Sequence, residues 1–254
     1  LNDVNAEMWY AKKPSKRARE LSEYGKSPEG IKALVIISLP PYREEATRSE
    51  MNKIDRIVHV NPKALKPPDW SALLDLNQTQ STAFSRTYRK IEEITDVQDI
   101  LDAVANSPIH SGTKNSIITK LENLTGQNVF SSVDKDEMNE LILDNNNYSF
   151  DTSLIYDEGL KRGITAYMIR IIADAAKRKK IDKPYCIAIE ELQNIVYGSI
   201  RNTKFEFYLN EMFRRLRVAG ASIISVQQNI GDLPDWAVPN ISNWLLLRIR
   251  DSKQ

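Results

Sequence analysis

The sequence has few of the residues that build several common kinds of site. It holds one cysteine, Cys186, which excludes an internal disulfide framework and any zinc site built on several cysteines. Only two histidines are present, His59 and His110, so a multi-histidine metal centre is not expected. No apolar run approaches the roughly 18 residues of a membrane span. The 254 residues include only nine glycines, so glycine-rich ligand-binding loops are not expected.

The composition is otherwise that of an ordinary folded protein. Hydrophobic residues make up 41% of the chain and charged residues 27%, which excludes a mainly disordered protein. The formal net charge is +1, so any contact with nucleic acid is expected from local basic patches rather than from overall charge. The single cysteine favours a reducing cytoplasm. The sequence begins with Leu1 and shows no signal peptide, so we expect the chain to start inside a longer gene product.

Short apolar runs bounded by turn residues predict strands that are buried on both faces. The predicted strands cover residues 31–38, 54–60, 148–153, 185–189, 221–226 and 243–249. Apolar residues at helical spacing predict helices at 70–76, at several places between 79 and 124, and at 164–175 and 205–216. Asp69 is the expected N-cap of the first of these helices. Strands that alternate with helices imply crossover connections, so the predicted fold class is α/β with a mostly parallel sheet.

The same pattern predicts three segments. Residues 1–78 hold the first strands of the α/β core, residues 79–146 form a helical insertion, and residues 147–254 complete the core. Ligands of open parallel sheets bind at the carboxyl ends of the strands, so candidate site residues are expected there.

Two adjacent carboxylates stand at the carboxyl end of the strand at 185–189. Glu190 and Glu191 are costly to place there unless they meet a cation or water. In nucleotide hydrolases an acidic pair at this position serves Mg²⁺ and the water that attacks the γ-phosphate. An exposed helix N-terminus, where acidic residues favour the helix dipole, explains the pair equally well. The pair by itself leaves both interpretations open.

The next predicted strand ends in a neutral amide. Gln227 can hold an attacking water or sense a γ-phosphate without adding charge, and a polar strand end is the simpler alternative. Between the two strands a predicted helix ends in Arg214, Arg215 and Arg217. Such arginines can contact DNA phosphates or reach a nucleotide in a neighbouring subunit, although a solvated helix face also explains them.

The order of these motifs resembles that of the HerA/FtsK superfamily of ring-forming DNA-pumping ATPases. The stretch 186–194 resembles the family's Walker-B element, with Leu192-Gln193-Asn194 where the HerA branch has Ala-His-Asn. The stretch 217–227 is similar to the family's Arg-Lys-x-Gly helix end and the strand that closes in Gln, with Val218 in place of the Lys.

Further similarity lies on both sides of these stretches. Residues 233–240 resemble the family's Pro-containing helix, and 247–251 resemble its last strand, which carries Arg248 towards the nucleotide or the subunit interface. Upstream the similarity is looser and reaches to about residue 55. There Asp151 and Ser153 stand at the positions of the family's Asp-x-Ser strand.

The resemblance implies a RecA-like P-loop NTPase core with a helical insertion. It implies ATP and Mg²⁺ as cofactors, assembly as a homo-hexamer, and translocation of double-stranded DNA by a HerA-like motor or helicase. A nuclease and a membrane DNA-transfer channel are the further partners that it suggests. The residues implied to carry the reaction are, by role, Glu191 for the attacking water, Glu190 for indirect support of Mg²⁺, Gln227 for the γ-phosphate, and Arg215, Arg217 or Arg248 for charge across subunits.

Two other functions stay open at this point. A conjugation- or virus-type DNA-transfer or packaging ATPase shares the same core and would place the protein at the inner face of the membrane. A non-hydrolysing DNA-binding or structural subunit would keep the fold without the activity.

The phosphate-binding loop of such ATPases, Gly-x-x-x-x-Gly-Lys-Ser/Thr, is absent from the 254 residues. The most similar stretch is Ser111-Gly-Thr-Lys, in which Gly and Lys are not adjacent and which no buried strand precedes. In the family this loop precedes the first strands, so we expect it before Leu1, unless the chain is a degenerate relative. The 254 residues by themselves are therefore expected to hydrolyse no ATP.

Overall fold

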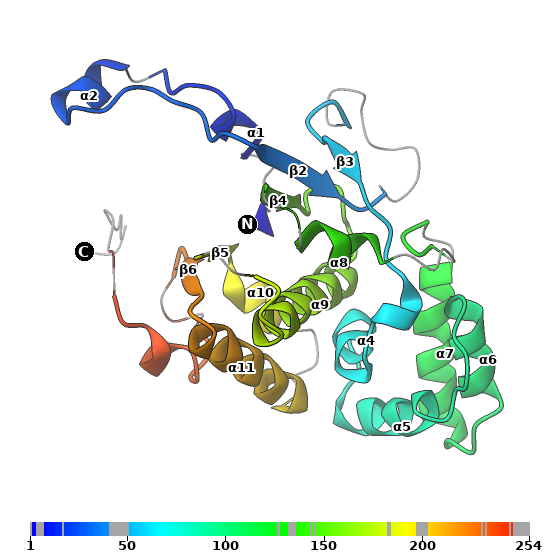
Figure 1. The fold of residues 1–254 in the computed structure, drawn as a ribbon. Coiled ribbons are helices and arrows are strands. Elements are labelled where there is room, and N and C mark those ends of the chain that lie inside the picture. Colours follow the sequence, from blue (N-terminus) through cyan, green and yellow to red (C-terminus); the bar gives the residue numbers. More distant parts are fainter. Residues whose placement is uncertain are drawn as a thin grey trace, which may run out of the picture.

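The computed structural model describes most of the chain, and Figure 1 shows its course. The described residues are 2–3, 8–16, 18–40, 51–125, 128–131, 136–142, 144, 146–181, 184–196, 203–229, 231, 233–243 and 245. Arg248 and most of the strand predicted at 243–249 lie outside the described residues.

The described chain contains both strands and helices. The strands are β1 (Asn2–Asp3), β2 (Leu34–Ser38), β3 (Arg56–Ile57), β4 (Asn147–Asp151), β5 (Cys186–Glu190) and β6 (Ser222–Val226). The α-helices are α1 (Met8–Ala11), α2 (Ala18–Glu23), α4 (Pro67–Leu73), α5 (Gln78–Tyr88), α6 (Val97–Ala105), α7 (Ser111–Thr125), α8 (Glu137–Ile142), α9 (Glu158–Lys177), α10 (Leu192–Val196) and α11 (Thr203–Val218). Two 3-10 helices are η1 (Pro62–Ala64) and η3 (Val238–Asn240).

The strands form one sheet in the order β3-β2-β4-β1-β5-β6, and its pairings are parallel. The longest registers pair Leu34 with Asn147 in β2 and β4, and Cys186 with Ser222 in β5 and β6. Parallel strands need crossover connections. Helix α11 supplies the one between the neighbours β5 and β6, and α9 connects β4 to β5, which lie on either side of β1. The predicted α/β class with a parallel sheet is therefore confirmed.

One apolar core joins β2, β4 and α9 to the helices between 67 and 142. Trp70 and Phe84 are fully buried in it, and the ring of Trp70 stacks on that of Phe130 with centroids 5.5 Å apart. Figure 1 shows α5, α6 and α7 grouped near α4 and away from α11. The helices predicted between 79 and 124 are thus α5, α6 and α7, and they pack into the same core as the first strands.

A second apolar core lies between α9, β5, α10 and α11. Ile189 of β5 and Leu209 of α11 are buried in it. Helix α9 belongs to both cores, because Ile164 faces the first and Ile169 the second. The hydrophobic stripe predicted at 164–175 therefore packs into both cores.

A close helix contact and a buried ion pair fix α4 against α9. Gly163 is required there, because a Cβ at this position would lie 2.3 Å from the Leu73 Cβ. Arg170 Nε donates to Asp69 Oδ2 at 2.8 Å, with side chains only 6% and 0% exposed. Tyr208 of α11 donates its hydroxyl to Asp69 Oδ1 at 3.0 Å. Burial raises the pKa of Asp69, although the charge of Arg170 acts in the opposite direction. Burial and the negative charge of Asp69 raise the pKa of Tyr208.

The structure corrects the bounds of the first two predicted strands. The strand predicted at 31–38 begins at Leu34, because the backbone of Ala33 has a φ of 51° and interrupts extended structure. The strand predicted at 54–60 is reduced to Arg56–Ile57. Strand β1 was not predicted, since two residues are too few to show a hydrophobic pattern.

The start of α4 also differs from the prediction. The helix begins at Pro67 with Lys66 as its N-cap, so Asp69 is not the N-cap residue. Asp69 lies at the third helical position, where its carboxylate accepts the backbone N–H of Lys66 at 2.8 Å. Two prolines at the start of the helix, which lack N–H donors, favour this earlier start.

Candidate functional site

The carboxyl ends of β5 and β6 bring the predicted acidic pair and amide together. Glu190 ends β5 and is in register with Val226, the last residue of β6. Glu191 and Gln227 follow these two residues directly, and the backbone N–H of Glu191 donates to the Val226 carbonyl oxygen at 3.0 Å. Three of the predicted site residues therefore lie at one edge of the sheet.

Glu191 has a strained backbone. Its φ is 52°, in the left-handed region that residues with a side chain rarely adopt. Helix α10 starts at the next residue, and the N–H of Asn194 donates to the Glu191 carbonyl oxygen at 2.8 Å. Strain of this kind costs about 1–3 kcal/mol and clusters at functional sites. The strained residue lies at the junction between β5 and α10, where the acidic pair also stands.

Two amide side chains complete this edge. Gln193 Nε2 donates to Glu191 Oε2, and Gln227 Nε2 donates to Ser225 Oγ at 2.8 Å. The Oε1 atoms of both glutamines are buried and have no hydrogen-bond partner among the described residues. A buried acceptor without a partner costs about 1–3 kcal/mol, so the edge is prepared to accept hydrogen bonds from water or a ligand.

The contact made by Gln193 was not foreseen from the sequence. In the sequence, Gln193 stands out only as a departure from a family pattern. The available signal was its position two residues after Glu191. Which of its neighbours the amide would meet depends on the backbone turn at Glu191.

The end of β4 is occupied by a local hydrogen-bond turn. Ser38 Oγ donates to the Asp151 carbonyl oxygen at 2.8 Å, and the N–H of Ser153 donates to Asp151 Oδ1 at 2.8 Å. Asp151 is 1% exposed. Asp151 and Ser153 therefore shape this strand end.

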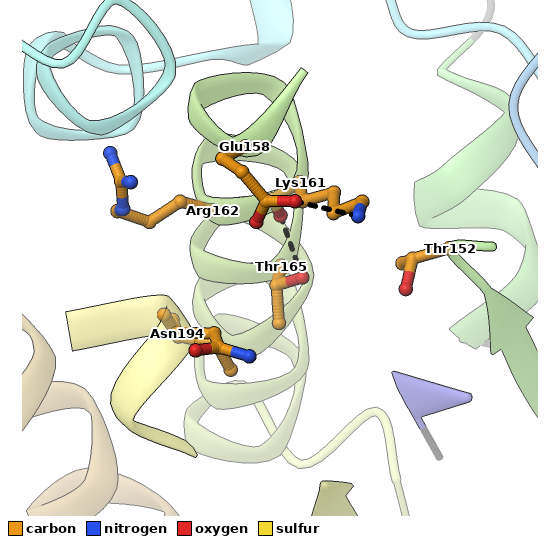
Figure 2. Close-up of a pocket in the computed structure, with 7 residues that line it drawn as sticks. Thr152, Glu158, Lys161, Arg162, Thr165 and Asn194 are labelled. Carbon is orange, nitrogen blue, oxygen red and sulfur yellow. Dashed lines mark hydrogen bonds and ion pairs between the residues drawn. The ribbon is translucent and has the colours of Figure 1, made fainter. Parts of the chain in front are cut away.

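A small cavity of about 70 Å³ lies between the segments that follow β4 and β5. Figure 2 shows Lys161 turned to Glu158, with 2.8 Å between Nζ and Oε1, and Arg162 extending away from them. Arg162 Nη1 binds Asp75 Oδ1 at 3.0 Å. The volume suits a few water molecules rather than a nucleotide. The cavity is lined by Thr152, Glu158, Lys161, Arg162, Thr165, Asn194 and Ile195.

The predicted arginines lie at the opposite edge of the sheet. Helix α11 ends just before β6 begins, so Arg215 and Arg217 stand near the amino end of β6. Five residues of strand, about 16 Å, separate that end from Gln227. Arg215 pairs with Glu211 at 3.1 Å, and Arg217 Nη1 donates to Asn240 Oδ1 at 3.1 Å. The fold does not bring these arginines to the acidic pair of the same chain.

Glu211 also binds Arg214, Nε to Oε2, at 2.9 Å. The hydrogen bonds from Arg214 and Arg215 lower the pKa of Glu211 to about 2. Arg214 and Arg215 thus share one carboxylate.

Neither a metal cage nor a membrane helix is found in the described part of the chain. Within it, no three His, Cys, Asp or Glu side chains gather in a way that could hold a metal ion. No helix in the same residues combines the length and apolarity that crossing a bilayer requires.

No protein-family model matches the sequence, and no curated protein matches it. Among solved structures, the chain is similar to VirB4 of Thermoanaerobacter pseudethanolicus, with a TM-score of 0.50 and 14% sequence identity. The similarity covers 91% of this chain and 69% of that chain. It supports the predicted α/β fold with its parallel sheet and many helices.

Proposed function

We propose that this chain carries the carboxylate side of an ATP-hydrolysing site in a DNA-transfer motor of the conjugation type. The observation that carries the proposal is the meeting of Glu190, Glu191 and Gln227 at the carboxyl ends of two adjacent parallel strands. The fold similarity to VirB4 favours this function over the HerA-like translocase as the description of the motor.

Each residue has a role that its position supports. The Glu191 carboxylate orients the attacking water and takes up its proton, and the Gln227 amide contacts the γ-phosphate or that water. Arg215 or Arg217 acts on a nucleotide in a neighbouring subunit, because the sheet separates both from the acidic pair of their own chain. Arg248 is a further candidate for that role and lies outside the described residues.

The acidic pair fits Mg²⁺ bound through water rather than in a protein cage. Mg²⁺ keeps several waters and takes one or two carboxylates together with substrate phosphates. Glu190 would support that hydration shell, and the buried Oε1 atoms of Gln193 and Gln227 offer further acceptors for its waters. When bound, the ion would neutralise charge on the phosphates.

Partners follow from the same proposal. Double-stranded DNA is the substrate that is moved, the chain assembles as a homo-hexamer, and a membrane DNA-transfer channel is the neighbouring partner. The proposal assigns the chain only one side of the nucleotide site, because the 254 residues hold no loop of the pattern Gly-x-x-x-x-Gly-Lys-Ser/Thr. That same observation favours a second candidate, a non-hydrolysing DNA-binding or structural subunit.

The test is Glu191→Gln in the protein as its gene encodes it. We expect ATP turnover, measured with and without double-stranded DNA, to fall at least about 100-fold, because the variant lacks the base for the attacking water. ATP binding, followed by titration with a fluorescent nucleotide, is expected to persist because the carboxylate acts on the water.

Glu92→Gln, the same chemical change at an exposed position before α6, is the control and should keep full turnover. Undiminished hydrolysis in Glu191→Gln would show that the catalytic carboxylate lies elsewhere. No hydrolysis in the unaltered protein would favour the non-hydrolysing subunit.

A further inference from the structure

We propose that Gln193 is a positioning residue that holds the Glu191 carboxylate in one orientation for the reaction. The inference rests on the proposed function, since it assigns Glu191 the attacking water. Its basis is the hydrogen bond from Gln193 Nε2 to Glu191 Oε2.

The support on which Gln193 stands is rigid. Gln193 lies in the first turn of α10, and the neighbouring Leu192, Ile195 and Val196 are each at most 3% exposed in the second core. The helix therefore presents the amide from a fixed position.

The backbone of Glu191 is pinned as well. Its N–H is bound by the Val226 carbonyl, and its carbonyl accepts the N–H of Asn194. With both backbone groups held, the remaining freedom of Glu191 lies in its side-chain torsions. The hydrogen bond from Gln193 restricts those torsions, which is what a base that must meet a water at one place requires.

The chemistry of the contact also favours positioning. An amide can hold a carboxylate without supplying a positive charge. A lysine or arginine in its place would stabilise the negative charge of the carboxylate and so make it a weaker base for the proton of the water. The reverse amide orientation would turn Gln193 Oε1 towards the carboxylate oxygen, and two acceptors repel each other. The observed orientation leaves Oε1 buried and without a partner among the described residues, so it is set by Glu191 rather than by a competing contact.

The first variant is Gln193→Met, which keeps the length of the side chain and removes the donor. In the protein as its gene encodes it, we expect kcat to fall about tenfold with the KM for ATP unchanged. The contact orients the base for the reacting water, so its loss slows the reaction step and leaves ATP binding as it was. Gln193→His restores an N–H donor and is expected to recover turnover to within about threefold of the unaltered protein.

Gln98→Met is the matched control. Gln98 Nε2 donates to Asp102 Oδ1 at 2.7 Å on α6, so the control removes an amide-to-carboxylate bond of the same kind far from the site. Its kcat should equal that of the unaltered protein. The double variant Glu191→Gln with Gln193→Met should be no slower than Glu191→Gln alone, since Gln193 acts through Glu191.

A second measurement needs no turnover. NMR relaxation of labelled Glu191 in the 254-residue chain should show lower side-chain order in Gln193→Met than in the unaltered chain or in Gln98→Met. Equal order overturns the positioning role, and so does an unchanged kcat in Gln193→Met. If Glu191→Gln is inactive while Gln193→Met is fully active, only this inference fails. If Glu191→Gln is fully active, the proposed function fails.

Discussion

The two halves of the sheet are covered very differently. In β2, which pairs with β3 and β4, four of the five residues are buried. In β6, which pairs with β5, the residues alternate between exposed and half-buried, and Ile224 and Val226 are 52% and 51% exposed. Yet both strands consist largely of branched apolar residues. Apolar content thus indicates a strand but not how fully its faces are covered.

The division also separates stability from chemistry. The half with β2 and β4 shares its core with α4 to α8, whereas the candidate site lies at the end of the half with β5 and β6. Sites that bind and release ligands are drawn from less tightly packed regions. The strained backbone of Glu191 lies in this half of the sheet, where hydrogen bonds to Val226 and Asn194 hold it.

The largest expected effect is the difference in stability between the same substitution made in each half of the sheet. Ile37→Ala in β2, where the side chain is 1% exposed, should lower the free energy of unfolding by about 2–5 kcal/mol. Ile224→Ala in β6 removes little buried surface and should cost less than about 1 kcal/mol. Urea unfolding of both variants measures the difference. Equal losses would show that the two halves are equally well covered.

A second pair of variants tests the close contact of α4 with α9. Gly163→Ala forces a Cβ against Leu73 and should destabilise the protein by about 1–3 kcal/mol. Gly112→Ala, near the start of α7, meets nothing closer than the His110 ring at 3.7 Å. It should be neutral or raise the stability by up to about 1 kcal/mol, because alanine favours helix. Thermal unfolding measures the stability of both variants. Equal unfolding temperatures would contradict the close contact between α4 and α9.

The smallest effect concerns the outer edge of the well-covered half. Burial opposes ionisation of Asp55, but the Ile36 N–H and Lys12 together lower its pKa below 3.8. A lowered pKa in the folded state stabilises the protein above the unfolded value, and this contribution is lost as the pH falls through the folded value.

Asp55→Asn should therefore be less stable at pH 7 by a few tenths of a kcal/mol, since the carboxylate is partly exposed and screened. The difference should shrink below about pH 4, which urea unfolding at several pH values would measure. A difference that grows as the pH falls would contradict this account of Asp55.

The parallel strands and the acidic pair could be predicted because they depend on local pattern. Apolar runs predict β5 and β6, and the parallel arrangement then brings Glu190 and Gln227 to one edge. The left-handed backbone of Glu191 could not be predicted, because it depends on a hydrogen bond to Val226 of another strand.

Packing in three dimensions explains the other surprises. Arg217 precedes β6 and so lies at the amino end of that strand, whereas the acidic pair lies at the carboxyl end of the parallel strand β5. Their separation therefore follows from the strand direction. The burial of Asp69 is not visible in the sequence, since its partners Arg170 and Tyr208 are 101 and 139 residues away.

Strand β6 is the last of the described strands, with a neighbour on one side only. The side of β6 that faces away from β5 pairs with no other described strand, and the five residues of β6 carry no charge that would repel a further strand. Five residues limit how many hydrogen bonds a further strand can form here, so the shortness of β6, rather than charge, limits pairing along this strand.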